Sequence, residues 1–144
     1  MPDINDRRLR IAIGENHVDL AESLCLLIDL QDDMRSVGHA ASSSGLLALA
    51  DGESPDLFIL DLSLDDGSSI PVMKQLRERL PDCAIVAFTG LANTVLAEQC
   101  LLAGCDRVLT KAGPIEDLLA ALREVAVQRA AQSSERGHAA AVTK

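Results

Sequence analysis

The chain has 144 residues, a length typical of one domain with a single sizeable core. Hydrophobic residues make up 48% of it, which excludes an intrinsically disordered chain, and the formal net charge of −9 argues against nucleic acid or an anionic membrane surface as a direct partner. No apolar run approaches the ~20 residues of a membrane span, and residues 1–10 lack the apolar core of a signal peptide. The sequence therefore predicts a globular, cytoplasmic protein.

The first third of the chain alternates between short apolar runs and stripes of helical spacing. Residues 9–13 are typical of a buried strand, and from Asp19 onward leucine and isoleucine recur at helical intervals. A weaker strand over residues 35–40 and a short helix over residues 42–51 follow. We therefore expect two strand–helix units in this part of the chain.

The same alternation continues to the C-terminal region. We expect three further units over residues 56–60 (strand), 71–80 (helix), 83–89 (strand), 91–103 (helix), 107–110 (strand) and from Pro114 (helix). Residues 1–8 are interpreted as an N-terminal lead and residues 132–144, which are small and polar, as a disordered tail. The predicted domain therefore spans residues 9–131.

Helix ends are marked by specific residues. Asp19 and Glu22 resemble a capping pair for the first helix, and Ser42 or Ser43 is suited to cap the second, because short polar side chains accept hydrogen bonds from free backbone N–H groups. Gly104 is expected to end the helix over residues 91–103.

Five strand–helix units with nearly continuous apolar strands predict a parallel sheet whose two faces are both covered by helices. Right-handed crossovers then give a doubly wound α/β domain. In such domains the functional site lies beyond the carboxyl ends of the strands.

The four cysteines form no C-x-x-C pair and have no clustered histidines beside them. The simplest interpretation is that they are small, buried, reduced side chains. Cys100 and Cys105 are an alternative redox pair, which the helix end expected at Gly104 disfavours.

Polar residues follow four of the five predicted strands. Glu15 and Asn16 follow the first, Asp61 follows the third, Thr89 ends the fourth and Lys111 follows the fifth. Because parallel strands end at one edge of the sheet, we expect these side chains to converge there.

Together these groups suit phosphoryl transfer. A carboxylate can attack phosphorus to form an acyl phosphate, and Mg²⁺ bound by oxygen ligands offsets the repulsion between the two anions. A lysine pairs with a phosphoryl oxygen as a point charge, and a threonine hydroxyl can donate a hydrogen bond to another.

The set of Asp61, Thr89 and Lys111 at strand ends resembles the receiver domain of the two-component response-regulator family, over about residues 9–128. The resemblance implies a flavodoxin-like strand order 2-1-3-4-5, with Asp61 as the phosphoacceptor, Lys111 as the phosphate-pairing lysine and Thr89 as the switch hydroxyl. Val108 occupies the position of the family's aromatic switch residue.

The resemblance also implies a Mg²⁺ site. Its ligands would be Glu15, Asn16, Asp61 and the backbone carbonyl of Ser63. Asn16 stands where the family usually has an acid, so we expect Mg²⁺ to bind weakly.

The implied function is a phosphorelay switch. A sensor histidine kinase or a histidine phosphotransfer protein would phosphorylate Asp61, and the surface of the fourth helix, fifth strand and fifth helix would then change its affinity for an unknown downstream protein. A homodimer is a further expectation. The chain would be a self-phosphorylating phosphoacceptor and not a turnover enzyme.

Three alternatives remain open at this point. Asn16 and Val108 are compatible with a receiver-like binding module that does not depend on phosphorylation. The chain is also compatible with a receiver fragment of a longer DNA-binding regulator, because "KAGPIEDLLAAL" resembles receivers that carry a helix-turn-helix domain. A haloacid-dehalogenase-like phosphatase is disfavoured, because it needs a general acid where this chain has Ser63.

Overall fold

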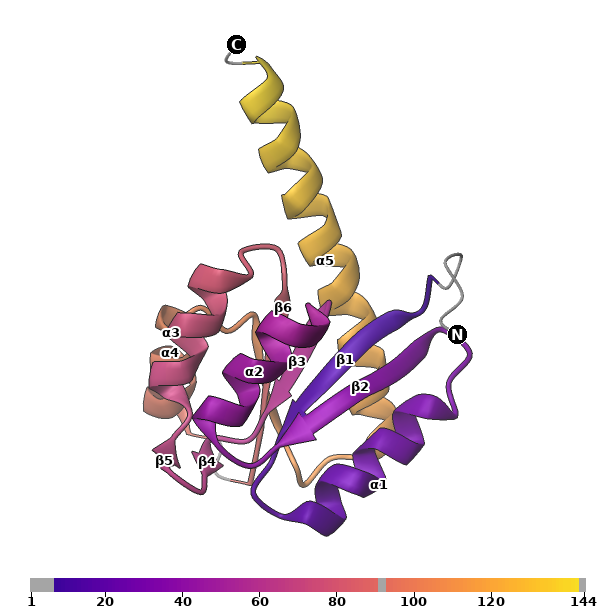
Figure 1. Cartoon of the computed structure of the whole chain (residues 1–144), viewed down its shortest axis with the longest axis vertical. Helices are drawn as coiled ribbons and strands as arrows, with labels where there is room; N and C mark the ends of the chain where they lie inside the picture. Colours follow the sequence, from indigo (N-terminus) through magenta and orange to yellow (C-terminus); the bar gives the residue numbers. More distant parts are fainter. Residues whose placement is uncertain (1–6, 91–92, 143–144) are drawn as a thin grey trace.

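The computed structural model describes residues 7–90 and 93–142. Its main sheet is built from five strands, β1 (Leu9–Gly14), β2 (Met34–Ala40), β3 (Leu57–Leu60), β6 (Ala84–Thr89) and β7 (Arg107–Thr110). All neighbouring strands are parallel and their order is β2-β1-β3-β6-β7 (Figure 1). This confirms the doubly wound fold and the expected order 2-1-3-4-5, since these are the five strands predicted from the sequence.

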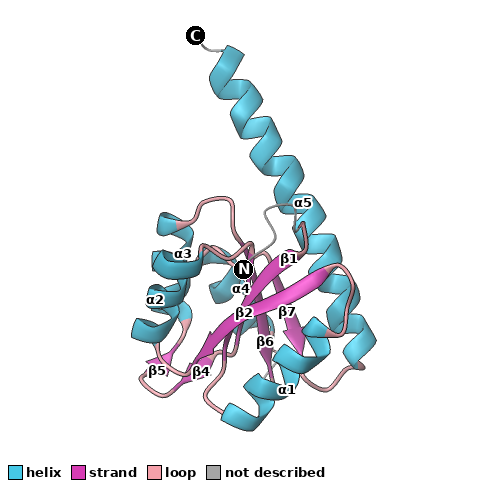
Figure 2. Cartoon of the chain, turned by 45° about the vertical axis from the view of Figure 1, so that its right-hand side comes forward, coloured by secondary structure: helices cyan, strands magenta, loops and turns pink. Residues whose placement is uncertain are grey.

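Helices cover both faces of the sheet (Figure 2). One face carries α1 (Val18–Asp29) and α5 (Ile115–Val142), and the other carries α2 (Ser43–Glu53), α3 (Ile70–Arg79) and α4 (Thr94–Leu102). None of the helices in residues 7–90 and 93–142 is both long and apolar enough to cross a membrane.

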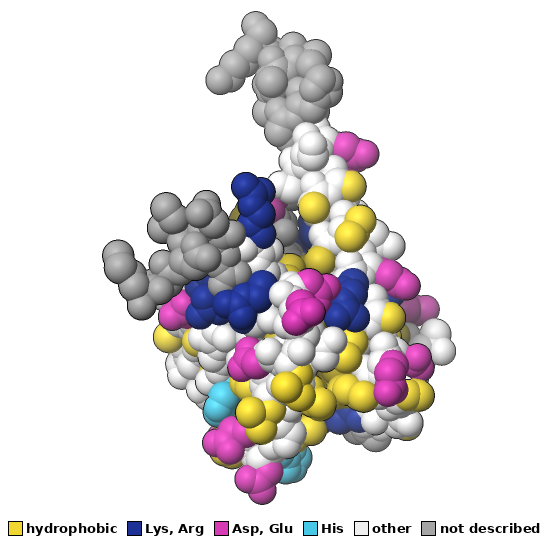
Figure 3. Space-filling model, turned by 90° about the vertical axis from the view of Figure 1, so that its right-hand side faces the viewer, with side chains coloured by type: hydrophobic (Ala, Val, Ile, Leu, Met, Phe, Trp, Pro, Cys, Tyr) yellow, Lys and Arg dark blue, Asp and Glu magenta, His cyan; other side chains and the backbone are white. Residues whose placement is uncertain are grey.

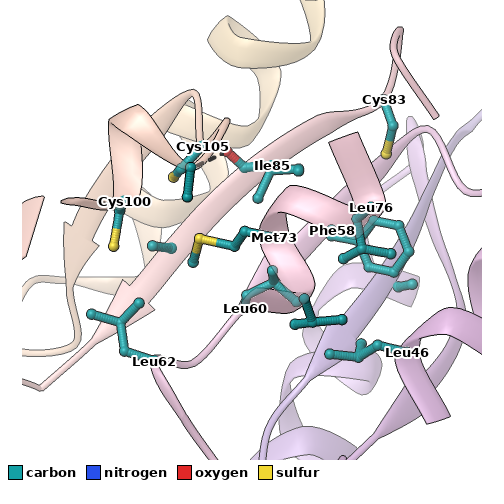
Figure 4. Close-up of a cluster of buried hydrophobic side chains, with 14 of the residues drawn as sticks. Leu46, Phe58, Leu60, Leu62, Met73, Leu76, Cys83, Ile85, Cys100 and Cys105 are labelled. Carbon is teal, nitrogen blue, oxygen red and sulfur yellow. Dashed lines mark hydrogen bonds between the residues drawn. The ribbon is translucent and has the colours of Figure 1, made fainter. Parts of the chain in front are cut away.

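The two faces of the sheet follow from the alternation of side chains along each strand. Ile11 and Ile13 pack towards α1 and α5, whereas Ala12 between them packs towards the other helices. On that second face Phe58 of β3 and Met73 of α3 are fully buried in one cluster (Figure 4). The inner strands β1, β3 and β6 are mostly buried, which explains why these strands are almost continuously apolar, whereas the edge strands β2 and β7 are largely half-buried.

Two of the expected caps can be compared with the structure. Ser42 is the N-cap of α2, and its hydroxyl accepts a hydrogen bond from the backbone N–H of Gly45 at 3.2 Å, as predicted. The capping pair Asp19–Glu22 is wrong, because the N-cap of α1 is His17, two residues before Asp19, and it makes no side-chain hydrogen bond.

Helix α4 begins later than expected. Asn93 is its N-cap and accepts a hydrogen bond from the backbone N–H of Leu96 at 2.8 Å. Residues 91–92, where the sequence analysis began this helix, lie outside the described residues. The expected end at Gly104 is confirmed, because this residue has a φ of 112°, a conformation that glycine adopts without strain.

Residues 132–144 were interpreted as a disordered tail, whereas the structure continues helix α5 through Val142, and residues 143–144 lie outside the described part of the chain. Helix α5 has 28 residues and continues through residues 132–142, which makes it about 42 Å long. Figure 1 shows its C-terminal part extending beyond the sheet and the other helices. This segment contains Ala, Gln, Glu and Arg, which favour the helical conformation even where no apolar face requires it.

A short hairpin was not predicted. The strands β4 (Ser63–Leu64) and β5 (Gly67–Ser68) pair in antiparallel fashion directly after β3, with Asp65 and Asp66 in the turn. Strands of two residues are too short to give a periodic signal. The hairpin places Ser63 next to the carboxyl end of β3.

The cysteines are unpaired thiols, and three of them are buried while Cys25 is half-buried. Burial raises the pKa of the Cys83 thiol to about 12 and that of Cys105 to about 11. Thiols that stay protonated are poor nucleophiles, which agrees with the structural interpretation and not with a Cys100–Cys105 redox pair.

Candidate functional site

The polar residues predicted at the strand ends come from four adjacent strands. Glu15 follows β1, Asp61 follows β3, Thr89 ends β6 and Lys111 follows β7, and these strands are neighbours in this order. Backbone hydrogen bonds continue the sheet register into the site, from Asp61 N to Gly14 O at 2.8 Å and from Lys111 N to Thr89 O at 2.8 Å. The predicted convergence at the carboxyl edge is therefore confirmed.

Lys111 joins the two carboxylates of the site. Its Nζ atom lies 3.0 Å from Glu15 Oε2 and 3.2 Å from Asp61 Oδ2. Burial alone would lower the pKa of the Lys111 ammonium, but its contacts with Glu15 and Asp61 outweigh burial and hold that pKa above its ordinary value. The lysine is therefore held charged between the carboxylates. Its Nζ also lies 6.0 Å from the centre of the Phe88 ring.

Glu15 is only 2% exposed and has partners for both oxygens. Its Oε2 contacts Lys111, and its Oε1 lies 2.9 Å from His17 Nδ1 and accepts from the backbone N–H of His17 at 3.3 Å. Burial alone would raise the pKa of Glu15, but the bonds to His17 and Lys111 outweigh it and lower that pKa below its ordinary value. Glu15 is therefore an ionised, fixed carboxylate.

Asp61 is 8% exposed, so one side of its carboxylate still reaches the surface. The backbone N–H of Ser63 donates to its Oδ1 at a long 3.4 Å, while its Oδ2 contacts Lys111. A largely buried carboxylate with a cation beside it and access from solvent has what a nucleophile towards phosphorus needs.

Asn16 fits the predicted cation site in one specific respect. Its side-chain oxygen Oδ1 is buried and has no hydrogen-bond partner in the described part of the chain. A buried acceptor without a partner costs about 1–3 kcal/mol, and a cation or a water molecule would remove that cost. Together with Glu15 and Asp61 this oxygen gives the donor set that Mg²⁺ prefers, so the residues present fit the ion.

Thr89 and Val108 lie on the same face of the sheet. Val108 of β7 is paired with Ala87 of β6, two residues before Thr89, and both Ala87 and Val108 pack in the cluster that faces α4. Thr89 is 3% exposed. The structure therefore places Thr89 and Val108 on the face that α4 covers, on neighbouring strands and offset by two residues, while their role remains a prediction.

His17 is the residue that sequence reasoning missed, since it was interpreted only as the start of a helix. Its ring reaches back to Glu15, so that Glu15, His17 and Asp61 each offer a ligand atom, all within 4.8 Å of one another. The signal available in the sequence was its position, two residues after Glu15.

Comparisons with known proteins agree with this geometry. The family model described as the response regulator receiver domain matches residues 11–123. The chain belongs to this family. It is thus a receiver domain of two-component response regulators, and such domains are signalling modules and not conventional enzymes.

Individual relatives support the assignment. The nitrate/nitrite response regulator protein NarL of Escherichia coli is 30% identical over 122 residues, which are 85% of this chain and 56% of NarL. The chain spans about half the length of the curated relatives it matches.

Solved structures show the same fold. A LuxR-family two-component response regulator from Aurantimonas has a TM-score of 0.80 at 23% identity, covering 85% of this chain and 87% of that chain. A response regulator from Burkholderia pseudomallei, solved with a phosphorylated aspartic acid and a calcium ion, has a TM-score of 0.74 at 24% identity, covering 88% of this chain and 74% of that chain.

Proposed function

We propose that this receiver accepts a phosphoryl group on Asp61 and acts as a phosphorylation-operated switch. The observation that carries the proposal is the contact of Lys111 with both Asp61 and Glu15 at the carboxyl edge of the sheet. The phosphorylated aspartic acid of the Burkholderia pseudomallei relative supports it. The donor would be a sensor histidine kinase or a histidine phosphotransfer protein.

The residues of the chain have distinct parts in this reaction. An oxygen of Asp61 forms the new bond to phosphorus while the phosphorus–nitrogen bond of the donor phosphohistidine breaks, and the released imidazole takes up a proton from solvent. The Lys111 ammonium forms ion pairs with Glu15 and Asp61. It would shift within the site to pair with an oxygen of the new phosphoryl group. Thr89 would donate its hydroxyl proton to another of these oxygens.

A divalent cation has a defined place in the proposal. Glu15, Asp61, the Asn16 side-chain oxygen and the Ser63 backbone carbonyl would hold Mg²⁺. When bound, Mg²⁺ reduces the repulsion between the carboxylate and the incoming phosphoryl group.

The proposed output is the surface formed by α4, β7 and α5. Movement of Thr89 towards the phosphoryl group would change the packing beside Val108, and through α4 the affinity for a downstream protein. Helix α4 carries the exposed apolar side chains Val95, Leu101 and Leu102, of which Leu102 lines a pocket shared with α3. Figure 3 faces the other side of the molecule, with α1 and α5, where apolar side chains are interspersed with charged ones.

The test is incubation of the protein with Mg²⁺ and acetyl phosphate, followed by intact-mass measurement. One phosphoryl adduct is expected on the wild type and on Asp65→Asn, a control in the exposed turn of the β4–β5 hairpin, and none on Asp61→Asn. No adduct on the wild type, together with no change in the amide NMR spectrum on adding beryllofluoride, would contradict the proposal.

A second candidate is a receiver-like module that binds its partner without phosphorylation. It is favoured by Asn16, which leaves the pocket with two carboxylates, Glu15 and Asp61. Equal partner affinity of wild type and Asp61→Asn, with and without acetyl phosphate, would support this candidate over the first.

The wider setting is proposed on the same basis. The relatives named as response regulators are longer than this chain. The chain would therefore act either as the receiver part of a DNA-binding regulator or together with a separate partner protein. We place it in the cytoplasm, and a homodimer would be one output state. In either case DNA binding would belong to another domain, because the net charge of −9 opposes contact with phosphates.

A further inference from the structure

The pocket around Asp61 contains a nitrogen donor as well as oxygens. Glu15, His17 and Asp61 place one ligand atom each within 4.8 Å of one another, and no other group of three such side chains does so among residues 7–90 and 93–135. Glu15 and Asp61 are 2% and 8% exposed, while the side chain of His17 is 72% exposed at the mouth of the pocket. A carboxylate pair at the base and an imidazole at the rim form an arrangement open to a cation from solvent.

The pocket offers a cation more than the oxygen ligands that Mg²⁺ uses. Two carboxylates, Glu15 and Asp61, are partly neutralised by Lys111, and Asn16 contributes an oxygen without charge. Mg²⁺ binds through hard, charged oxygen ligands and gains little from an imidazole. Divalent transition metals, in contrast, bind imidazole nitrogen strongly and follow the order Mn²⁺ < Co²⁺ < Cu²⁺ > Zn²⁺ at mixed N/O sites.

We propose that His17 makes this pocket a mixed nitrogen–oxygen site that selects a divalent metal of the Co²⁺ or Zn²⁺ class over Mg²⁺. His17 Nδ1 already lies 2.9 Å from Glu15 Oε1. A metal bound between these atoms displaces the hydrogen of this contact, which the exposed ring then carries on Nε2, so both atoms become ligands together with an oxygen of Asp61. Asn16, between Glu15 and His17 in the sequence, has a buried side-chain oxygen without a hydrogen-bond partner in the described part of the chain, and this oxygen would be a fourth donor.

The proposal rests on the proposed function, since both place a cation beside Asp61. Different experiments test the two, so one can be refuted without the other. Metal selection is measured by binding, without phosphorylation. Failure of Mg²⁺-dependent phosphorylation in the wild type would remove the switch function and leave the transition-metal site untouched.

The experiment is calorimetric titration of untagged protein with Co²⁺ and, separately, Mg²⁺, combined with the visible absorption of bound Co²⁺. The chain has no Trp or Tyr, so intrinsic fluorescence is a poor readout. The variants are His17→Gln and, as the matched control, His39→Gln, which removes an exposed imidazole on β2.

We expect His17→Gln to weaken Co²⁺ binding at least about tenfold, because even outer-shell changes at metal sites cost 10–100-fold. The Mg²⁺ affinity should change by less than about twofold, since Mg²⁺ takes oxygen ligands. His39→Gln should match the wild type with both ions. Unchanged Co²⁺ affinity and absorption in His17→Gln would overturn the proposal, as would an equal loss for both ions.

Discussion

Lys111 reaches Asp61 across an intervening strand. The two residues are 50 positions apart in the sequence and follow β7 and β3, which are separated in the sheet by β6, yet Lys111 Nζ lies 3.2 Å from Asp61 Oδ2. A lysine bridges this gap because its stem is long and flexible. The ion pair therefore depends on the sheet order as well as on the two residues.

Replacing Lys111 by Gln should destabilise the fold as well as remove the phosphate partner. Two nearly buried carboxylates then face each other without a cation, and loss of hydrogen bonds to charged groups costs about 1.5–3 kcal/mol. Urea unfolding followed by far-UV circular dichroism measures this change. Lys74→Gln, at an exposed position of α3, is the control and should stay within about 0.5 kcal/mol of the wild type.

How far the sequence predicts this site depends on which contacts are set by topology. The meeting of Glu15, Asp61, Thr89 and Lys111 was predictable, because each follows an apolar strand and parallel strands end at one edge. The contact of His17 with Glu15 was not, because it depends on the φ and ψ angles of the turn between β1 and α1. Its residues carry no periodic signal.

The fold shows the same division. Strand positions and order followed from the apolar runs and from the family resemblance, whereas helix ends depended on single side chains. Asn93 caps α4 through one hydrogen bond, and a window of helical periodicity cannot locate such a bond. The length of α5 was missed because its last turns have no apolar stripe, and intrinsic helix propensity decides there.

Acid should weaken the fold through Glu15. Its folded-state pKa is lowered below the ordinary value of 4.5, so its contribution to stability is fully present above about that pH and is lost as the pH falls through the folded-state pKa. The free energies of unfolding of wild type and Glu15→Gln, measured with EDTA present, should differ at pH 7 and converge as the pH is lowered below the ordinary value. A constant difference down to the lowest pH would contradict the ionised state assigned to Glu15.

A second ion network lies at the opposite, amino-terminal edge of β6 and β7. Asp106 Oδ2 accepts from Arg77 at 2.9 Å and from the backbone N–H of Ile85 at 2.8 Å, and Asp106 Oδ1 accepts from Arg129 at 2.9 Å. Arg77 also donates to the backbone oxygen of Gly104 at 2.7 Å. The network thus connects α3, the loop before β7 and the point where α5 leaves the domain.

Asp106→Asn should be strongly destabilising, by about 3–5 kcal/mol, because it leaves two partly buried guanidinium groups without their anion. The control is Asp51→Asn, which removes the exposed partner of Arg79, a pair with side chains 65% and 42% exposed. Exposed pairs contribute about 0–1 kcal/mol. Denaturant unfolding of the two variants should therefore differ clearly, and equal losses would contradict the importance given to burial.

Asn16→Asp should tighten Mg²⁺ binding and destabilise the metal-free protein. The added carboxylate stands beside Glu15 and Asp61, so without a cation it adds repulsion, and with Mg²⁺ it replaces a neutral donor by a charged one. An affinity gain of about tenfold corresponds to ~1.4 kcal/mol. Calorimetric titration gives the Mg²⁺ affinity. In EDTA the Tm of Asn16→Asp should be lower than that of the wild type, and excess Mg²⁺ should raise the Tm of the variant by more than it raises the Tm of the wild type.

Asp66→Asn, in the turn of the β4–β5 hairpin, should leave Mg²⁺ affinity unchanged. If Asn16→Asp binds Mg²⁺ no more tightly than the wild type, Asn16 does not face the cation and the ligand set proposed for this pocket is wrong.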